Sequence, residues 1–232
     1  MNEFIEKAKK EFLDKGYTSF DVKYFDSEFA SFIETNLACD FNKNFKEAFF
    51  EGRFDSETFK THFRKKDFNE VNVYKSDLIK EHDWMDGDRP NMTQCWYWSS
   101  IEYVQNYLKI RDINLRKYIE DKIYNILKYF YEFSDTTKLN QGQLQFTLYD
   151  KDCVFTQHSD GIGVNYCSII IYLNKNYKKE YGGLLLLNDE YVLPELGTVA
   201  LMDLSKHNTR HGVSKVLDGP GRYAILSFPI II

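Results

Sequence analysis

What this sequence lacks excludes several classes of protein. No run of residues approaches the ~18 consecutive apolar positions that a membrane-spanning helix needs. The first ten residues mix charged and apolar side chains and lack the apolar segment of a secretory signal peptide. The four cysteines include no CxxC pair, which argues against a zinc site or a redox motif. We therefore expect a reduced, cytoplasmic protein without a membrane partner.

The sequence also lacks a basic excess. Its net charge is −5 and its pI is about 5.6, whereas a protein that binds nucleic acid through phosphates normally carries a basic excess or stripe. The densest basic runs, Arg64–Lys66 and Lys175–Lys179, are short and read most simply as solvated surface. Nucleic acid is therefore an unfavoured partner. The oligomeric state is not indicated.

The chain has ordinary globular proportions, with 43% hydrophobic and 28% charged residues, and 232 residues suffice for one domain with a sizeable core. Aromatic residues are abundant at 17%, mainly Phe and Tyr. We find no internal repeat and no low-complexity segment. One compact unit is expected, with a change of character near residue 140.

Helical spacing dominates the part before residue 140. Apolar residues from Phe4 to Leu13 share one side of a helix that Gly16 would end, and an extended piece follows from Tyr17 to Phe25. Asp26 or Ser27 can cap a second helix. The strongest amphipathic pattern predicts a helix from Leu115 to Phe133. Residues 1–140 are therefore expected to form a helical support region.

Residues 141–232 carry a β pattern. Strict alternation predicts a strand over 143–149, and turn residues separate further short runs. These runs cover 153–158, 167–173, 183–188, 198–203, 211–216 and 222–228. No helical crossovers intervene, so the fold class expected is α+β with a mainly β core built as a sandwich or barrel.

Three residues of this part suit a metal. His158 and Asp160 stand two positions apart at the end of a strand, so their side chains can point to one face, and His211 begins a later strand. Two histidines and one carboxylate form the facial triad of non-haem Fe(II) oxygenases, which leaves coordination positions open for other ligands. A His-x-Asp pair alone is weak evidence, because both residue types are common at the surface ends of strands.

Arg222 begins the apolar run Tyr223–Phe228. Burying a guanidinium is costly unless an anion pairs with it, and a dicarboxylic co-substrate that chelates the metal at one end needs such a partner at the other. The simpler reading, that Arg222 pairs with a carboxylate of the protein, would be favoured if Arg222 stood alone.

Two other residues compete with this set. His207 lies four positions before His211 and could be mistaken for the second histidine of this set. The family resemblance given in the next paragraph favours His211, because Val213, Val216 and Arg222 follow it at positions that match that family. Asp203 ends a strand, but no histidine precedes it by two residues, so we interpret it as a surface acid.

A series of motifs is spread over residues 143–228. In order they are Tyr149, His158–Asp160, Ile171–Asn174, Gly182–Leu184, Pro194–Gly197, His211–Val216 and Gly221–Ala224. The series resembles the prolyl-4-hydroxylase-like 2-oxoglutarate oxygenases, and the run Ile171–Tyr177 followed by Gly182–Gly183 resembles their oxygen-sensing prolyl hydroxylase branch in particular. The resemblance implies a double-stranded β-helix, or jelly roll, with supporting N-terminal helices. It also implies His158, Asp160 and His211 as iron ligands.

The same resemblance implies a co-substrate site and a reaction. Arg222 would pair with the remote carboxylate of 2-oxoglutarate, Tyr172 would hydrogen-bond that carboxylate, and Tyr149 would line the pocket. The implied cofactors are Fe(II), 2-oxoglutarate and O2, with ascorbate as an accessory reductant. Co-substrate would be decarboxylated to succinate and CO2 while an unactivated C–H bond is hydroxylated.

Three functions remain open on this basis. The first is hydroxylation of a peptidyl residue such as proline. The second is the same chemistry on a free amino acid, a small metabolite or a nucleobase. The third is a catalytically silent jelly roll that binds or senses a ligand, although loss of a metal ligand or of the arginine would have signalled it, and all four residues are present.

Overall fold

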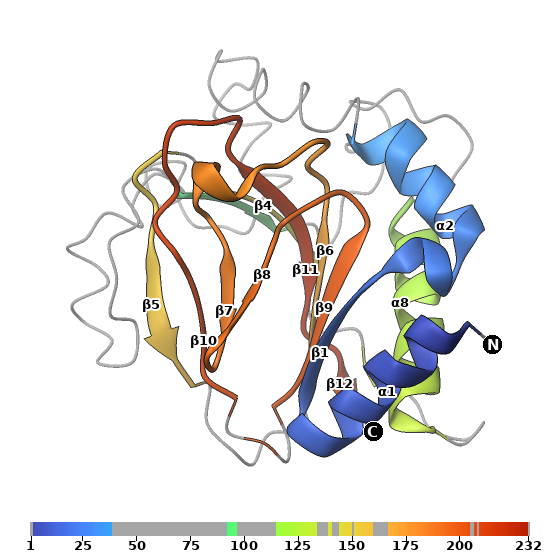
Figure 1. Cartoon of the computed structure of the whole chain (residues 1–232). Coiled ribbons are helices and arrows are strands. Elements are labelled where there is room, and N and C mark those ends of the chain that lie inside the picture. The colour runs from blue at the N-terminus through green and yellow to red at the C-terminus, as the bar shows by residue number, and fades with distance from the viewer. Residues whose placement is uncertain are drawn as a thin grey trace.

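The computed structural model of the chain describes residues 2–38, 92–96, 115–133, 139–140, 144–149, 151–159, 167–204, 207 and 209–231. In these residues two main antiparallel sheets face each other, and helices cover the outer side of the larger one (Figure 1). This is the expected jelly roll with supporting helices. No helix in this part of the chain is both long and apolar enough to cross a membrane.

The larger sheet has six strands and combines both halves of the chain. Its spatial order is β1 (Tyr17–Asp21), β9 (Thr198–Asp203), β6 (Cys167–Tyr172), β11 (Arg222–Ser227), β4 (Leu144–Tyr149) and β2 (Met92–Trp96). The N-terminal part therefore supplies strands as well as helices. Every residue of β6 is buried, because both faces of this central strand are covered.

The smaller sheet has four strands and lies on the side of the molecule away from the helices (Figure 1). Its order is β5 (Phe155–His158), β10 (His211–Val213), β7 (Leu185–Leu187) and β8 (Glu190–Val192). A separate two-stranded ladder joins β3 (Leu139–Asn140) to β12 (Ile230–Ile231). The hairpin strand β8 was missing from the sequence prediction.

The helices form where capping residues allow them. Gly16 ends α1 (Glu3–Lys15) in a left-handed conformation, with φ of 81°, and its N–H donates to the Phe12 carbonyl over 2.8 Å. Asp26 caps α2 (Ser27–Phe32), which a π-helical turn, η2 (Ile33–Ala38), continues. Short 3-10 turns are η1 (Val22–Tyr24) and η3 (Lys179–Tyr181), and the long helix is α8 (Leu115–Tyr131).

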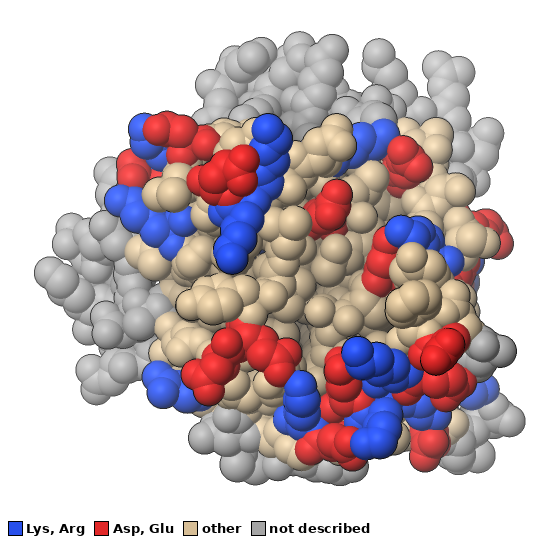
Figure 2. All heavy atoms as spheres, in the orientation of Figure 1, with Lys and Arg blue, Asp and Glu red and all other residues tan. Residues whose placement is uncertain are grey.

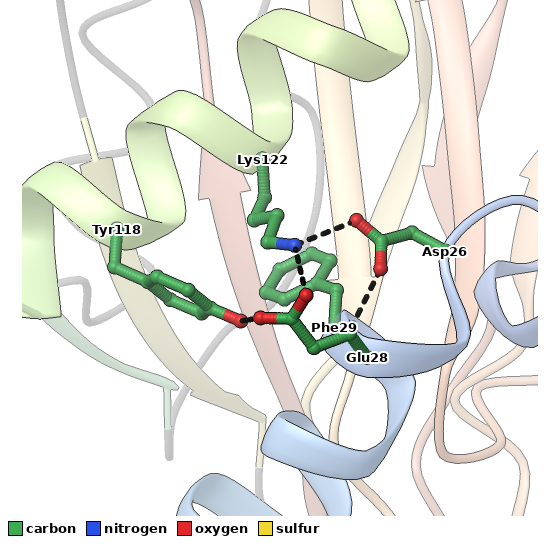
Figure 3. Close-up of polar contacts among 5 residues, drawn as sticks. All are labelled: Asp26, Glu28, Phe29, Tyr118 and Lys122. Carbon is green, nitrogen blue, oxygen red and sulfur yellow. Dashed lines mark hydrogen bonds and ion pairs between the residues drawn. The ribbon is translucent and has the colours of Figure 1, made fainter.

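Charged side chains fix α2 to α8 (Figure 3). Lys122 of α8 donates to Asp26 over 2.8 Å and lies 3.7 Å from Glu28, while the Tyr118 hydroxyl bonds Glu28 over 3.3 Å. The other carboxylate oxygen of Asp26 accepts the N–H of Phe29 over 2.9 Å. Asp26 therefore serves as helix cap and ion-pair partner at once.

Two buried clusters occupy the two faces of the large sheet. On the outer face, residues of β6 with odd numbers pack with the helices, and the cluster includes Phe12, Phe29 and Phe130. On the inner face, Ile170 and Tyr172 pack with residues of the small sheet. This alternation is the strand periodicity that the sequence showed. It directs every even-numbered side chain of β6 towards the space between the sheets.

Candidate active site

His158 and His211 lie directly opposite each other in neighbouring strands. Strand β10 pairs with β5 in antiparallel register with His211 opposite His158, and their ring centroids are 4.4 Å apart. His211 is buried, and His158 is half-buried. Side chains of a directly opposed cross-strand pair project to the same face of a sheet. Two imidazoles at this separation can supply two ligands to one metal ion.

The orientation of His211 is suited to that role. Its Nδ1 lies 3.4 Å from the carbonyl oxygen of Thr209. A proton on Nδ1 can point to this carbonyl, and in that tautomer the lone pair suited to a metal is on Nε2.

A glycine permits the close approach of the two histidine strands. A Cβ atom on Gly212 would lie 2.5 Å from the Phe155 carbonyl oxygen and 2.9 Å from the Gln157 nitrogen. The pairing register also shifts between His211 and Val213. Only a residue without a side chain fits here, immediately after His211.

Hydrogen bonds at the ends of three strands hold the histidine pair. The Gln157 side chain donates to the Asn188 carbonyl oxygen over 2.6 Å. Asn188 in turn exchanges two bonds with Arg210: its N–H donates to the Arg210 carbonyl, and its side-chain oxygen accepts the Arg210 N–H. The residues next to His158 and His211 in the sequence are therefore tied to one turn.

Arg222, Tyr172 and Tyr149 meet on the inner face of the large sheet. Arg222 stands opposite Tyr149 in the β11–β4 register, and Tyr172 stands opposite Ala224, two residues further along β11. The guanidinium lies 5.0 Å from the centroid of the Tyr149 ring and 4.8 Å from that of Tyr172. Its Nη2 donates to the Tyr172 hydroxyl over 2.7 Å. Cation–π contact and a hydrogen bond thus hold the guanidinium in place.

The charge of Arg222 is not neutralised by any described residue. Arg222 is only 2% exposed, no acidic side chain of the described segments forms an ion pair with it, and its Nε has no hydrogen-bond partner there. A buried charge of this kind is costly. The arrangement is explained if an anion from outside the described chain binds beside it.

The phenol of Tyr172 is kept neutral. Burial raises its pKa, and the neighbouring Arg222 charge only partly opposes this rise. Because the Tyr172 oxygen accepts from Arg222, its own proton remains available to donate to a bound anion.

A buried asparagine holds the backbone on both sides of Arg222. The Asn174 side-chain amide donates to the Gly221 carbonyl over 2.8 Å, and its oxygen accepts the Tyr223 N–H over 2.8 Å. The start of β11 is therefore fixed independently of any ligand, and Arg222 is presented from a rigid strand.

A small buried cluster links the histidine pair to the group formed by Arg222, Tyr172 and Tyr149. Val213, two residues beyond His211 on β10, packs in the same cluster as Tyr149, over whose ring Arg222 lies. Phe155 packs against this cluster and also contacts His158, with ring centroids 4.2 Å apart. The two parts of the site are thus joined by contiguous packing.

The remaining predicted residues are placed as follows. Asp160 lies outside the described residues. His207, the rival to His211, lies beside Gly16 at the end of α1, where a Cβ on Gly16 would come within 2.2 Å of its imidazole. Asp203 is not a surface acid, and that interpretation was wrong: it is 4% exposed, because the last position of β9 is covered by the helical side of the protein. Its N–H donates to the Gly16 carbonyl over 2.7 Å.

The sequence reasoning also missed residues that build the site. Gln157, which stands beside a predicted ligand, and Asn188, which ends a predicted strand, were not singled out. Asn174 was quoted only as part of a motif and was given no role. Tyr177 was likewise given no role. A tyrosine in a lysine-rich run resembles surface, yet Tyr177 is 4% exposed.

The described surface carries both signs of charge. On the face shown in Figure 2, Lys and Arg side chains alternate with Asp and Glu, and no continuous basic band crosses it. Among the described lysines, many pair with a neighbouring acid, as Lys215 does with Asp152 over 2.9 Å. This distribution gives no extended track for a phosphate backbone on this face.

Comparison with known proteins agrees with the geometry. Residues 144–228 match the family model described as the 2OG-Fe(II) oxygenase superfamily. A comparison with curated proteins finds no sequence match. The matched segment contains the histidine pair and the group formed by Arg222, Tyr172 and Tyr149, and it coincides with the segment in which the sequence showed its resemblance.

Solved structures share the fold at low sequence identity. A Pseudomonas putida prolyl-4-hydroxylase is 14% identical with a TM-score of 0.56, covering 98% of both chains. A prolyl hydroxylase from Trichoplax adhaerens, in complex with a hypoxia inducible factor peptide, is 13% identical with a TM-score of 0.58, covering 97% of this chain and 88% of the other. The epimerase SnoN of nogalamycin biosynthesis, described as non-haem and alpha-ketoglutarate dependent, is 10% identical with a TM-score of 0.55, covering 97% and 82%.

These findings confirm the expected resemblance to prolyl-4-hydroxylase-like 2OG-Fe(II) oxygenases and the jelly-roll fold. The enzyme class to which they point is a 2-oxoglutarate-dependent dioxygenase, and the cofactors of the matched family are Fe(II), 2-oxoglutarate and O2.

Proposed function

We propose that this protein is an Fe(II)- and 2-oxoglutarate-dependent hydroxylase of peptidyl residues, with proline as the leading target. In this proposal His158, Asp160 and His211 hold the iron, while Arg222 and Tyr172 bind the remote carboxylate of 2-oxoglutarate and Tyr149 lines its pocket. The observation that carries the proposal is the buried Arg222, whose charge has no anionic partner among the described residues.

The donor set fits the cofactors. Two opposed imidazoles offer nitrogen ligands, and Asp160 follows His158 by two positions in the sequence and would complete a facial triad. A guanidinium flanked by phenols fits a carboxylate, because a carboxylate accepts paired N–H bonds as well as phenolic donors. When bound, the iron would supply the O2 chemistry that converts 2-oxoglutarate to succinate and CO2 and hydroxylates a C–H bond.

The protein's own residues have distinct tasks in this scheme. Arg222 and Tyr172 would fix the remote end of the co-substrate and so orient its other end towards the histidine pair. The ring of Tyr149 and the side chains of Val213 and Val216 form a buried apolar cluster, which would exclude water from a co-substrate bound beside it. Asn174 would keep Arg222 in place before and after turnover.

A peptidyl substrate is supported by two kinds of observation. Prolyl hydroxylases occur among the structurally similar proteins, and the Trichoplax adhaerens enzyme is in complex with a peptide fragment. The sequence motifs around Ile171–Asn174 and Gly182–Gly183 also resemble the oxygen-sensing prolyl hydroxylase branch most closely. A second candidate, a small metabolite, is favoured by the similarity to SnoN, an epimerase from a biosynthetic pathway.

Turnover assays separate the candidates. The full chain would be incubated with Fe(II), ascorbate, 2-oxoglutarate and O2, together with pools of proline-containing peptides or of matched peptides with alanine in place of proline. We expect proline peptides to stimulate succinate formation and to gain one oxygen atom by mass spectrometry. Stimulation by free amino acids or metabolites alone would favour the second candidate. No succinate under any condition, despite bound 2-oxoglutarate, would favour a silent binding module.

A further inference from the structure

Tyr177 is a buried tyrosine with no assigned role. It lies between β6 and η3, is 4% exposed, and its hydroxyl has no hydrogen-bond partner among the described residues. A buried hydroxyl left unpaired costs free energy, so native structures seldom retain one without a reason. Phenylalanine would fill the same volume without this cost. The hydroxyl therefore suggests a hydrogen-bond partner from outside the described residues.

The hydroxyl of Tyr177 lies close to the side chain of Arg222. A Cβ atom built on Gly183 would lie 2.9 Å from the Tyr177 oxygen, 3.2 Å from Cγ2 of Val216 and 3.4 Å from Cδ of Arg222. The absence of a side chain at Gly183, where φ is +61°, therefore lets these side chains pack against the same point of the backbone. Arg222 and Tyr177 are thus brought together by a glycine that belongs to neither of their elements.

Arg222 and Tyr177 each carry a buried donor without a partner among the described residues. The Nη2 of Arg222 is occupied by Tyr172, whereas its Nε has no partner. Burial raises the pKa of Tyr177 to about 12, and the Arg222 charge opposes this rise only in part. The hydroxyl is therefore protonated at neutral pH and can donate. A guanidinium and a protonated phenol, both short of an acceptor, suit one anion.

We infer that Tyr177 is a further co-substrate-binding residue, whose hydroxyl donates a hydrogen bond to the remote carboxylate of 2-oxoglutarate alongside Arg222 and Tyr172. This inference rests on the proposed function. A carboxylate offers two oxygens with about four acceptor positions, which is enough for all three residues. The family resemblance assigned only Arg222, Tyr172 and Tyr149 to this carboxylate and its pocket, so Tyr177 extends the set.

A binding experiment with two ligands tests the inference. The full chain, loaded with Mn(II) in place of Fe(II), would be titrated calorimetrically with 2-oxoglutarate and with 2-oxopentanoate, which carries a methyl group where 2-oxoglutarate has its remote carboxylate. Tyr177→Phe removes only the hydroxyl. Tyr181→Phe is the matched control, because its ring contacts that of Tyr177 edge-on with centroids 5.5 Å apart and is partly exposed.

Tyr177→Phe should weaken 2-oxoglutarate binding about tenfold or more, the effect of one hydrogen bond to a charged group. Binding of 2-oxopentanoate should stay unchanged in this variant, and Tyr181→Phe should bind both ligands like wild type. The melting temperature of Tyr177→Phe without ligand should equal or exceed that of wild type, because the substitution removes an unpaired buried hydroxyl. Wild type should gain more thermal stability from 2-oxoglutarate than the variant does.

The results that would overturn the inference differ from those that would overturn the proposed function. If wild type binds 2-oxoglutarate and Tyr177→Phe binds it equally well, a water or another group satisfies the hydroxyl, and the inference is wrong while the proposed function stands. Equal weakening of both ligands, or a lower unliganded melting temperature with an unchanged ligand-induced shift, would make Tyr177 structural and also overturn it. If wild type binds neither ligand, the proposed function itself fails, and the inference fails with it.

Discussion

At the scale of single residues, the contacts of Arg222 show whether this residue serves to bind a ligand or to stabilise the fold. A guanidinium paired within the protein contributes to folding, and its removal leaves an uncompensated partner. Arg222 instead has a hydrogen bond to Tyr172, ring contacts with two tyrosines, and no acidic partner in the described segments. Among the described residues nothing offsets the cost of burying this charge, which favours binding of an anion.

This reasoning predicts the behaviour of Arg222→Met, which replaces the charge by an apolar chain of similar length. Affinity for 2-oxoglutarate should fall at least a hundredfold, whereas the free energy of unfolding should stay level or rise by about 1–3 kcal/mol, as when buried charges are replaced by apolar residues. Calorimetric titration and urea unfolding measure the two effects. The exposed Arg210→Met is the control. A loss of several kcal/mol in Arg222→Met would show instead that Arg222 pairs within the protein.

The residue scale also shows what sequence reasoning can find. His158, His211 and Arg222 stood out because their types and order match a chemistry, and Tyr172 and Tyr149 stood out through the family resemblance. The structure brings these residues together in two adjoining groups. Tyr177 and Asn174 were given no role. Their importance depends on contacts across the barrel, with Gly183 and with Gly221 and Tyr223, and no local pattern of sequence encodes such contacts.

At the scale of elements, local chemistry predicted where helices begin and end. Gly16 and Asp26 act as the stop and the cap expected of them, and the stripe from Leu115 onward forms α8. The hairpin of β7 and β8 was missed because it is short. Its turn is the dipeptide Asn188–Asp189, with Asn188 at φ of 50°. This dipeptide, typical of tight hairpin turns, was the sequence feature from which the hairpin could have been predicted.

Asp26 allows a prediction about how α2 is held to α8. Burial alone would raise the pKa of Asp26, but hydrogen bonds from Lys122 and from the Phe29 N–H outweigh it and lower the pKa. Asp26→Asn keeps an oxygen for the cap and loses the ion pair, so it should cost about 0.5–1 kcal/mol in unfolding free energy. Asp26→Ala loses both and should cost about 1–3 kcal/mol.

Urea unfolding at neutral pH and at pH 3 checks these values. Since a lowered pKa stabilises the folded state above the ordinary carboxyl pKa and this contribution is lost on acidification, the difference between wild type and Asp26→Asn should shrink at pH 3. Equal costs for the Asn and Ala variants would show that the cap contributes nothing. A difference between wild type and Asp26→Asn that does not depend on pH would show that the charge contributes nothing.

At the scale of the whole molecule, the change near residue 140 is a change in sequence pattern and not a boundary in the packing. Strands β1 and β2 come from the N-terminal part and pair with β9 and β4. The large sheet therefore cannot be completed by residues 141–232 alone. Alternation revealed most strands, but strand order depends on long-range pairing that a single sequence does not contain.

Buried phenols predict a loss of stability at high pH. The pKa values of Tyr131, Tyr172 and Tyr177 are raised by burial, so these groups keep their protons in the folded protein above pH 10, where the unfolded chain loses them. Their contribution is complete below pH 10 and falls by about 1.4 kcal/mol per pH unit for each group above it. Urea unfolding between pH 9 and 11 measures the slope. Tyr131→Phe should reduce the slope of the unfolding free energy against pH by about 1.4 kcal/mol per pH unit. A slope unchanged by this substitution would contradict this account.

The central claim is that one molecule of 2-oxoglutarate bridges a metal at the histidine pair and the buried Arg222. Anaerobic titration of the full chain with Fe(II) and 2-oxoglutarate tests it most directly, through the weak visible charge-transfer band of the chelate. We predict a band that saturates at one equivalent and disappears in both His158→Ala and Arg222→Ala. A well-folded wild-type protein without the band, or a band that persists in Arg222→Ala at unchanged 2-oxoglutarate affinity, would contradict the claim.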